Sequence, residues 1–375
     1  MGKQVKTPRF YVDMPTFLHA TGQTGWDATT RGGAELLYMN PSNPFTRIDG
    51  DNILFSIGHY ADNQPKTSFP INFFALLNHN LASESSELKI EAKKGLVADD
   101  YTNPILHGTT INGVNVLNTT ASTDDNLGAQ YNGTSISTFS DKNGLNEYWR
   151  AFKVYTESEV GIDNYTHQLG SFVVGKYWDT PNSPDLSLTM SRRFDGIKKQ
   201  KTIGGKTLAN IYYDGPTEWT MNHPIDNDLN GTYKYPPFEL DTTAQVDTQG
   251  YRFDYRAKSG LGRKGLRSWS LTFSYISEDD MWMDNEVSSK VTSDSIDDGE
   301  IPTGGSDPNP MFTDDSFNFV WNCTLGGTLP FIFQPDNTNN NPDQFSICTF
   351  RDNTLSVKQV AYNTYSLSVT IDEVA

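Results

Sequence analysis

The sequence predicts a mainly β protein built of two β-sandwich domains, and three features support this fold class. Aromatic residues make up 12% of the 375 residues, with 21 Phe, 18 Tyr and 7 Trp among many Asn, Asp, Gly, Ser and Thr. This mixture is typical of short strands joined by turns. Apolar and polar residues alternate in both halves of the chain, whereas a single segment has a clear helical period.

The first 45 residues have no sustained period. Phe10, Tyr11 and Val12 are apolar, as are Phe17 and Leu18, and the turn-type sequence TGQTGWDATTRGG follows them. We predict that residues 1–45 form an N-terminal arm that packs on another domain or on another subunit.

Residues 46–185 are predicted to form the first β-sandwich. Strand patterns recur at 53–57, 71–77, 88–93, 149–155 and 171–178. The polar stretch from 97 to 145 suits long loops at the end of a sandwich. The sequence DTPNSPD at 179–185 contains two prolines and marks a domain boundary near residue 185.

Residues 186–375 have the clearest strand patterns and are predicted to form the second β-sandwich. Two runs alternate with Ser and Thr and so predict half-buried strands: Trp269, Leu271, Phe273 and Tyr275, and then Tyr365, Leu367, Val369 and Ile371.

One helix is predicted at about 315–325. Its apolar stripe follows the helical period and comprises Phe317, Val320, Trp321, Thr324 and Leu325. Asp314 or Asp315 is the expected N-cap, and Gly326 with Gly327 is expected to end the helix.

The chain is strongly acidic, with a formal net charge of −17. Such a protein is not expected to bind a phosphate backbone specifically, because that affinity needs Lys and Arg. A loop predicted at 284–315 has nine acidic side chains and one Lys, Lys290. It is either a solvated surface loop or a wall that repels nucleic acid.

No catalytic or metal-binding pattern is found in the sequence. The six histidines are scattered, and there is no HExxH, GxSxG, P-loop or dinucleotide-binding motif. The carboxylate pairs Asp179 with Asp185 and Asp279 with Asp280 are interpreted as turn and helix-start residues. Asp297, Asp298 and Glu300 lack the spacing of an EF-hand Ca²⁺ loop. We therefore predict no enzyme activity, no cofactor and no metal, with Cys323 and Cys348 as buried free thiols.

An aromatic group of Tyr148, Trp149, Tyr177 and Trp178 allows two interpretations. Trp149, Tyr177 and Trp178 could form a platform on which a sugar stacks. Aromatic residues in strands more often fill cores, so the core interpretation is favoured.

The C-terminal third has a recognisable order of features. A basic Gly/Arg turn precedes the strand WSLTF; a helix ending in Gly-Gly, the strand PFIF and a final strand ending in the acidic IDE follow. This order, over roughly 245–375, resembles the tail-tip proteins of tailed bacteriophages, namely distal tail proteins and M-type minor tail proteins. The resemblance implies a β-sandwich flanked by one helix and related to the tail-tube fold.

The middle of the chain carries a second resemblance. The segment NFFALLNHNLASESSELKIEA and the later LGSFVVGKYW are similar to discoidin-like jelly-roll modules of phage tail proteins. Many such modules bind glycans, but no set of residues here matches a binding motif.

Together the resemblances imply a structural protein of the virion tail tip, assembled in the host cytoplasm. We expect a ring, with six copies the expected number, that continues the tail tube and anchors hub or fibre proteins while DNA passes. Asp294, Asp297, Asp298 and Glu300 are the candidate residues facing that DNA. The sequence has no run of 18 apolar residues, so no membrane insertion is expected. The alternatives are a glycan- or receptor-binding module and, less favoured, a depolymerase.

Overall fold

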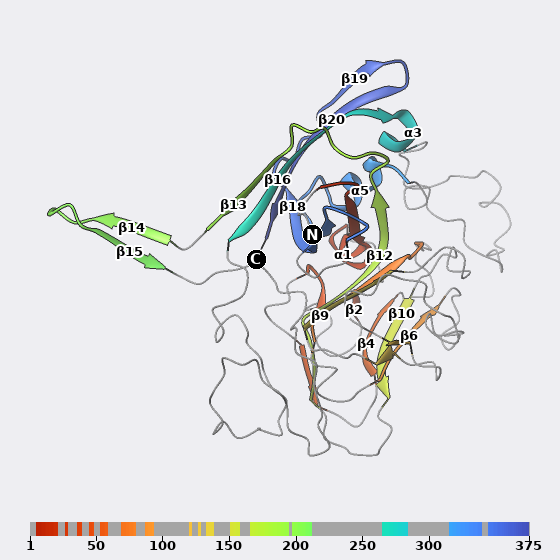
Figure 1. The fold of residues 1–375 in the computed structure, drawn as a ribbon. Coiled ribbons are helices and arrows are strands. Elements are labelled where there is room, and N and C mark those ends of the chain that lie inside the picture. The colour runs from red at the N-terminus through yellow and green to blue at the C-terminus, as the bar shows by residue number, and fades with distance from the viewer. Residues whose placement is uncertain are drawn as a thin grey trace.

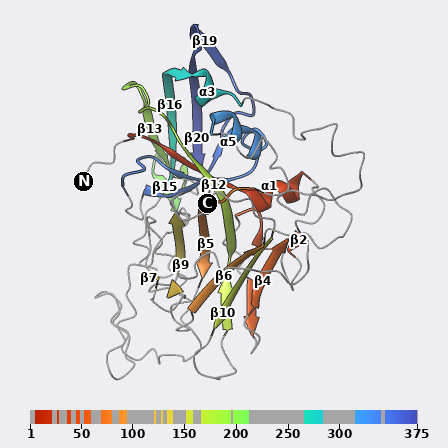
Figure 2. The same ribbon diagram turned by 90° about the vertical axis from the view of Figure 1, so that its right-hand side faces the viewer.

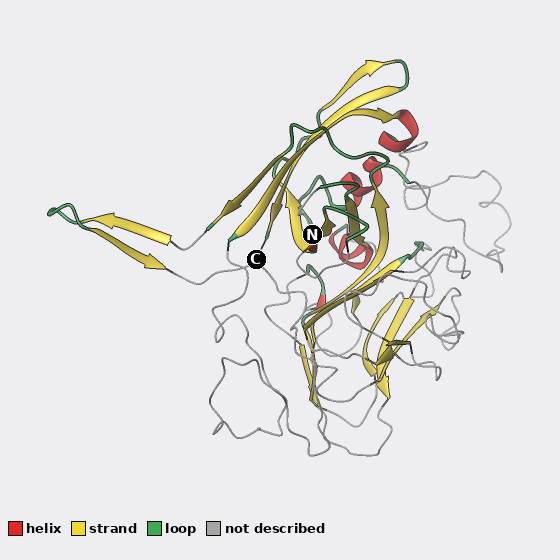
Figure 3. Ribbon diagram, in the orientation of Figure 1, coloured by secondary structure: helices red, strands yellow, loops and turns green. Residues whose placement is uncertain are grey.

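The structure is a computed structural model, and it describes sixteen segments of the chain. They are residues 5–21, 27–28, 36–39, 45–48, 53–58, 69–79, 87–93, 120–121, 127–128, 133–138, 151–157, 166–194, 197–211, 265–283, 315–339 and 344–374. The fold is mainly β, as the sequence predicts (Figure 3). Helices are few and short in these segments: α1 (Met14–Ala20), α3 (Glu278–Met281) and α5 (Phe317–Cys323).

A ten-stranded antiparallel sheet forms the best described part of the molecule. Its strands lie in the order β13, β16, β20, β18, β17, β1, β12, β5 and β9, and β19 pairs with β20. Their bounds are β1 (Arg9–Asp13), β5 (Phe73–His79), β9 (Gly133–Thr138), β12 (Ser171–Asp179), β13 (Thr189–Arg193), β16 (Leu266–Ser277), β17 (Phe331–Gln334), β18 (Ser346–Phe350), β19 (Val357–Ala361) and β20 (Thr364–Glu373).

Three smaller sheets accompany it. The six-stranded sheet has the order β2, β4, β10, β6, β8 and β7, and two further pairs are β3 with β11 and β14 with β15. Their bounds are β2 (Asp27–Ala28), β3 (Phe45–Ile48), β4 (Ile53–Gly58), β6 (Glu87–Lys93), β7 (Thr120–Ala121), β8 (Leu127–Gly128), β10 (Ala151–Glu157), β11 (Thr166–Leu169), β14 (Ile197–Lys201) and β15 (Thr207–Ile211).

The described part of the predicted N-terminal arm packs into the core of the large sheet as strand β1 and helix α1. Strand β1 lies between β12 and β17, with Phe10 opposite both Trp178 and Phe333. Phe10, Tyr11 and Val12 are all buried because both faces of this strand are covered. A strand buried on both faces has no alternation in its sequence, so its pattern gave no strand prediction.

The main core lies on one face of the large sheet. It joins Phe10 of β1, Trp178 of β12 and Phe333 of β17 to apolar side chains of α1 and α5. Figure 1 shows α1 and α5 between β12 and the β16–β20 part of the sheet, and in Figure 2 both helices lie to the right of β16 and β20. A second, smaller apolar cluster around Tyr11 and Ile332 covers the other face. The central strands are therefore sealed on both sides.

The long strands β16 and β20 confirm the alternation predicted for them, with one exception. Trp269, Leu271 and Phe273 are buried, whereas Tyr275 is 75% exposed. The register between β16 and β20 shifts between Phe273 and Ile276, which is the mark of a β-bulge. The bulge turns Tyr275 to solvent and places Ile276 in the core.

Helix α5 confirms the predicted helix, but its N-cap differs from the prediction. Ser316 is the N-cap, and the Asp315 carboxylate instead pairs with Lys176 of β12 at 2.5 Å. Gly326 and Gly327 follow the helix with positive φ, as expected for its end. A Cβ at Gly327 would lie 2.5 Å from Phe350 Cβ, so only glycine fits there.

The predicted boundary near residue 185 lies between β12 and β13, which belong to the same sheet. The connecting segment is hydrogen-bonded to both sides: the Thr180 N–H donates to the Pro8 carbonyl, and the Asp185 N–H donates to the Thr272 carbonyl. The ten-stranded sheet therefore continues across residue 185. The division into a 46–185 and a 186–375 domain stays a prediction.

Candidate interaction surface

The hairpin of β14 and β15 projects away from the large sheet (Figures 1 and 3). Five antiparallel pairs join its strands, from Ile197 opposite Ile211 to Lys201 opposite Thr207. Its turn is closed by the Thr202 N–H, which donates to the Lys206 carbonyl at 2.8 Å, and by the Gly205 N–H, which donates to the Thr202 carbonyl at 2.9 Å. Gly205 has a φ of 78°, which glycine adopts without strain. Gly204 and Gly205 thus form the turn of this hairpin.

This hairpin is basic and exposed. Residues 197–211 contain four of the chain's Lys residues and none of its 46 Asp and Glu. From Lys199 to Leu208 every side chain is exposed except that of Thr202, which is half-buried. Ile203 and Leu208 are apolar side chains in contact with solvent. Positive charge and exposed apolar groups thus occur together on a projecting element of an acidic protein.

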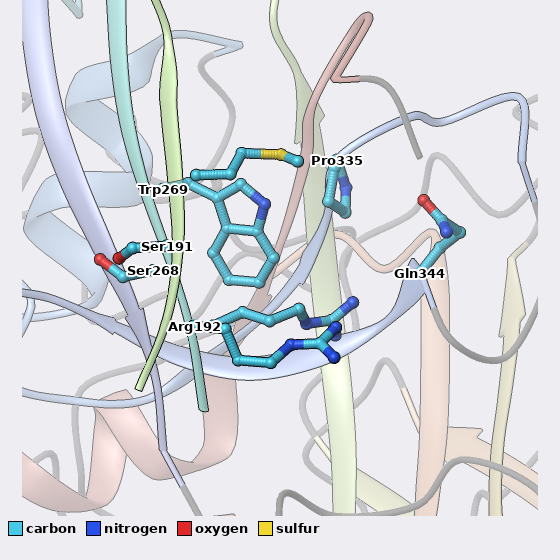
Figure 4. A pocket seen from close by; sticks show the side chains of 8 residues that line it. Ser191, Arg192, Ser268, Trp269, Pro335 and Gln344 are labelled. Carbon is cyan, nitrogen blue, oxygen red and sulfur yellow. The ribbon is translucent and has the colours of Figure 1, made fainter. Parts of the chain in front are cut away.

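A pocket of about 190 Å³ lies where β13 leads toward the hairpin. Met190 and Arg192 of β13 lie opposite Trp269 and Arg267 of β16, and Pro335 and Gln344 close the other side. Figure 4 shows Ser191 and Ser268 pointing away from the side occupied by Trp269 and Arg192, as alternation along a strand requires. The pocket is apolar at its Trp269 wall and cationic at its Arg192 wall.

Arg267 in this pocket wall is neutralised from within the protein. Its guanidinium donates to both carboxylate oxygens of Glu373, at 3.1 and 3.3 Å, and to the Phe345 carbonyl at 3.0 Å. It also donates to the Ser346 hydroxyl and lies 5.0 Å from the centre of the Trp269 ring. The Glu373 side chain is 1% exposed, so this is a buried ion pair with its donors and acceptors largely satisfied.

A second charged surface, which we call the acidic shoulder, surrounds α3. It comprises Glu278, Asp279, Asp280 and the neighbouring Tyr275. Ser277 caps the helix, since its hydroxyl accepts the Asp280 N–H, and this confirms the interpretation of Asp279 and Asp280 as helix-start residues. Glu278, Asp279 and Tyr275 are exposed, whereas Asp280 is half-buried and accepts a hydrogen bond from the Ser277 hydroxyl. Two exposed carboxylates, a third that is partly covered and one aromatic ring therefore lie within six residues of the chain.

The predicted sugar platform is wrong for Trp178. That side chain is 4% exposed, packs against Phe10 and Phe317, and donates its indole N–H to the Asp315 carbonyl. Tyr177, the residue before Trp178 in β12, packs against the apolar cluster on the opposite face of the sheet. Adjacent residues of a strand point to opposite faces, so these two rings cannot form one platform. Trp149 lies outside the described residues.

Tyr177 also has a partner on one face of its ring. The Arg9 guanidinium lies 3.9 Å from the centre of that ring and binds both carboxylate oxygens of Asp179, at 2.6 and 2.7 Å. Asp179 is therefore held in an ion pair, whereas Asp185 accepts a hydrogen bond from the Ser274 hydroxyl. The structure gives these two carboxylates separate structural partners, at the end of β12 and in the segment that follows it.

Asp13 is a buried carboxylate at the junction of β1 and α1. The Thr16 hydroxyl donates to Asp13 Oδ2, whereas Oδ1 has no hydrogen-bond partner among the described residues. Burial raises the pKa of Asp13 to about 7, against the opposing effect of the hydrogen bonds from Thr16 and from the backbone of Val174. The Asp13 carboxylate is buried beside the start of α1, and neither this location nor its contacts with Thr16 and Val174 suggest a catalytic role.

The other sequence predictions are placed as follows. Asp294, Asp297, Asp298 and Glu300 lie outside the described residues, as does most of the predicted loop at 284–315. Cys323 and Cys348 are buried free thiols, as predicted. In the described segments, no group of His, Cys, Asp and Glu could hold a metal ion. None of the described helices is long and apolar enough to cross a membrane.

Comparison of the chain with protein-family models, with curated proteins and with solved structures finds no match.

Sequence reasoning missed two parts of this surface. The hairpin has a local signal, a Gly-Gly turn between short segments, which is a known hairpin pattern. Arg267 and Glu373 lie 106 positions apart, and no local pattern could have paired them.

Proposed function

We propose that this chain is a structural, non-enzymatic component of the tail tip of a tailed bacteriophage. In this proposal its copies form a ring, with six the expected number, that continues the tail tube, anchors hub or fibre proteins and lets DNA pass. The protein would be made in the host cytoplasm and act in the virion.

The observation that carries the proposal is how the features of the C-terminal resemblance come together. Arg267, which follows the basic turn of the resemblance, lies in β16, and Glu373 lies at the end of β20; the two form the buried ion pair. The WSLTF strand lies in β16, most of the PFIF strand lies in β17, and α5 packs on the sheet that contains both. The resemblance implies a β-sandwich flanked by one helix, and α5 is the helix that it places there.

Two further observations favour an assembly protein over an enzyme. The carboxylates Asp179, Asp185 and Glu373 are held by Arg9, Ser274 and Arg267, so each of the three has a structural partner. The hairpin of β14 and β15 exposes apolar and basic side chains on a projecting element, which suits contact with another chain.

The decisive experiment is to locate the chain in the particle. Virions labelled with an antibody or gold tag on this chain are imaged by electron microscopy, and copy number is measured by quantitative mass spectrometry. A label at the tail tip with about six copies supports the proposal. A label on the capsid, or its absence from virions, contradicts it.

The proposed lining of the DNA path is tested separately. Replacing Asp294, Asp297, Asp298 and Glu300 with Lys is expected to leave assembly intact and to slow genome ejection, because DNA would then bind the wall. Replacement of the same residues with Asn, Asn, Asn and Gln separates loss of negative charge from gain of positive charge. Wild-type ejection by the Lys variant would contradict a role of these carboxylates in the lumen.

A further inference from the structure

The hairpin of β14 and β15 has little side-chain packing of its own to stabilise it. An isolated two-stranded hairpin is at best marginally stable in water, and three strands or packing against another element are normally needed. Along Lys199–Leu208 this hairpin buries no side chain fully. Its outer strand edges also carry unpaired backbone donors and acceptors, which can bind another chain. These properties suit a docking element.

We propose that the hairpin of one copy docks on the acidic shoulder of a second copy. The inference deepens the proposed function and rests on it in one respect, namely that a ring needs a repeated contact between copies. It names the two surfaces that make that contact: the basic hairpin, with the exposed Lys199, Lys201 and Lys206, on one copy, and Glu278, Asp279 and Asp280 on the next.

The charge of the chain makes a second copy a suitable occupant. The chain as a whole carries a net charge of −17, although the charged side chains of residues 197–211 are all positive. Two copies therefore repel each other overall, and a hairpin that faces an acidic surface offsets this repulsion locally. Such complementarity selects the orientation of docking and accelerates encounter.

The acidic shoulder is a better receptor than the pocket beside β13. Arg267 in that pocket is paired with Glu373, but Arg192 also lines it, so a Lys-rich hairpin would meet the like charge of Arg192 there. The shoulder offers three carboxylates together with the exposed ring of Tyr275. That ring supplies an apolar contact for Ile203 or Leu208, as aromatic anchors do in protein interfaces.

The places of the two surfaces suit a repeated contact. Figure 1 shows the hairpin projecting from one side of the molecule, whereas α3 lies at the opposite end of β16. A contact between two different surfaces is head-to-tail, and a head-to-tail contact generates a ring when its rotation closes. A single interface of this kind can therefore join all copies of a ring.

Nucleic acid is the competing occupant, and the observations disfavour it. Residues 197–211 contain no Phe, Tyr or Trp on which a base could stack. Four Lys side chains on a chain with net charge −17 give a weak and strongly salt-dependent attraction to phosphates. A protein surface with carboxylates and an exposed ring matches the hairpin better.

The test uses two charge-reversed full-length chains. The first carries K198E, K199E, K201E and K206E, and the second carries E278K, D279K and D280K. Self-association is measured by analytical ultracentrifugation at low and at physiological salt. We expect each variant alone to self-associate roughly 10- to 100-fold more weakly than the wild-type chain. An equimolar mixture should recover assembly. The acidic hairpin of the first variant fits the basic shoulder of the second, and the hairpin of the second and the shoulder of the first keep their wild-type charges and so also fit each other.

The matched control replaces the same four Lys residues with Arg, which keeps the charge and should keep assembly. Wild-type association by the Lys-to-Glu variant, or no recovery in the mixture, overturns the proposed contact while leaving a ring possible. Monomeric wild-type protein at all concentrations, with no ring in virions, contradicts the proposed function itself. A Lys-to-Glu variant that assembles normally but loses binding to a 20-base-pair duplex identifies nucleic acid as the occupant instead.

Discussion

The β16–β20 pair and the β14–β15 hairpin are both antiparallel, but they are held in different ways. In the first, Trp269, Leu271 and Phe273 lie opposite Ile371, Val369 and Leu367, and all six side chains are in the main core. In the second, five backbone pairs join strands whose side chains, where described, are exposed or half-buried. Packing within the chain accounts for the first pair, whereas the second pair has no comparable packing among the described residues. The comparison separates a part of the chain stabilised by its own core from the part that we propose to be a docking element.

The largest effect is expected from the buried ion pair at the end of β20. Glu373→Ala leaves the Arg267 guanidinium buried without its partner, which should lower the free energy of unfolding by about 3–5 kcal/mol. Asp372→Ala, one residue earlier, is the matched control. It breaks the exposed pair with Arg351 and should cost about 1 kcal/mol or less. Urea unfolding at pH 7 measures both, and equal losses would contradict the account of the core.

The next effect contrasts two glycines: Gly327, which packs against Phe350 of the main core, and Gly204, which lies in the hairpin turn. At Gly327, φ is +82° and a new Cβ would meet Phe350, so Gly327→Ala should cost roughly 1–3 kcal/mol. At Gly204, in the hairpin turn, a new Cβ meets no atom within 4 Å. Gly204→Ala should therefore leave the melting temperature unchanged. Thermal unfolding by circular dichroism tests the pair; a large loss from Gly204→Ala would mean that the hairpin is packed after all.

A smaller, pH-dependent effect is expected at Asp13. Because its pKa is raised from 3.8 to about 7 on folding, its contribution to stability is full below pH 3.8 and is lost as the pH rises toward 7. Asp13→Asn removes this ionisation. Its melting temperature should exceed that of the wild-type chain by about 2–5 °C at pH 8 and match it near pH 4. Parallel pH profiles for the two proteins would show that Asp13 is not buried as described.

The smallest effect on folding is expected in the hairpin. Replacing Lys199 and Lys201 with Ser changes exposed side chains only, so the free energy of unfolding of the monomer should stay within about 0.5 kcal/mol of wild type. Self-association of the same variant should nevertheless weaken. A stability loss without an association defect would reverse the roles assigned to the two regions.

The sequence predicted those strands that have one face in the core and one face in solvent. The alternation at Trp269–Phe273 and at Leu367–Ile371 arises because a half-buried strand must change polarity at each residue. The prediction from alternation failed at Tyr275, since a β-bulge adds a residue to one strand and no local sequence pattern reveals it. The same prediction failed at β1, because burial of both faces removes the alternation.

The candidate surface was predictable in part. Helix α5 and the helix start at Asp279 and Asp280 followed from caps and from the helical period, which are local signals. The burial of Trp178 and the Arg267–Glu373 pair depend on segments far apart in the chain, so local patterns could not decide them. The role proposed for the hairpin depends on its being a two-stranded sheet with no third strand among the described residues, and only the fold displays that.

Amide hydrogen exchange followed by mass spectrometry tests the central claim most directly. Wild-type protein is compared as dilute monomer and as concentrated assembly. We predict that amides of β16 and β20 are protected in both samples, whereas amides of β14 and β15 exchange rapidly in the monomer and become protected in the assembly. Strong protection of the hairpin in the monomer, or rapid exchange in the assembly, would contradict the claim that the hairpin is completed by a second copy.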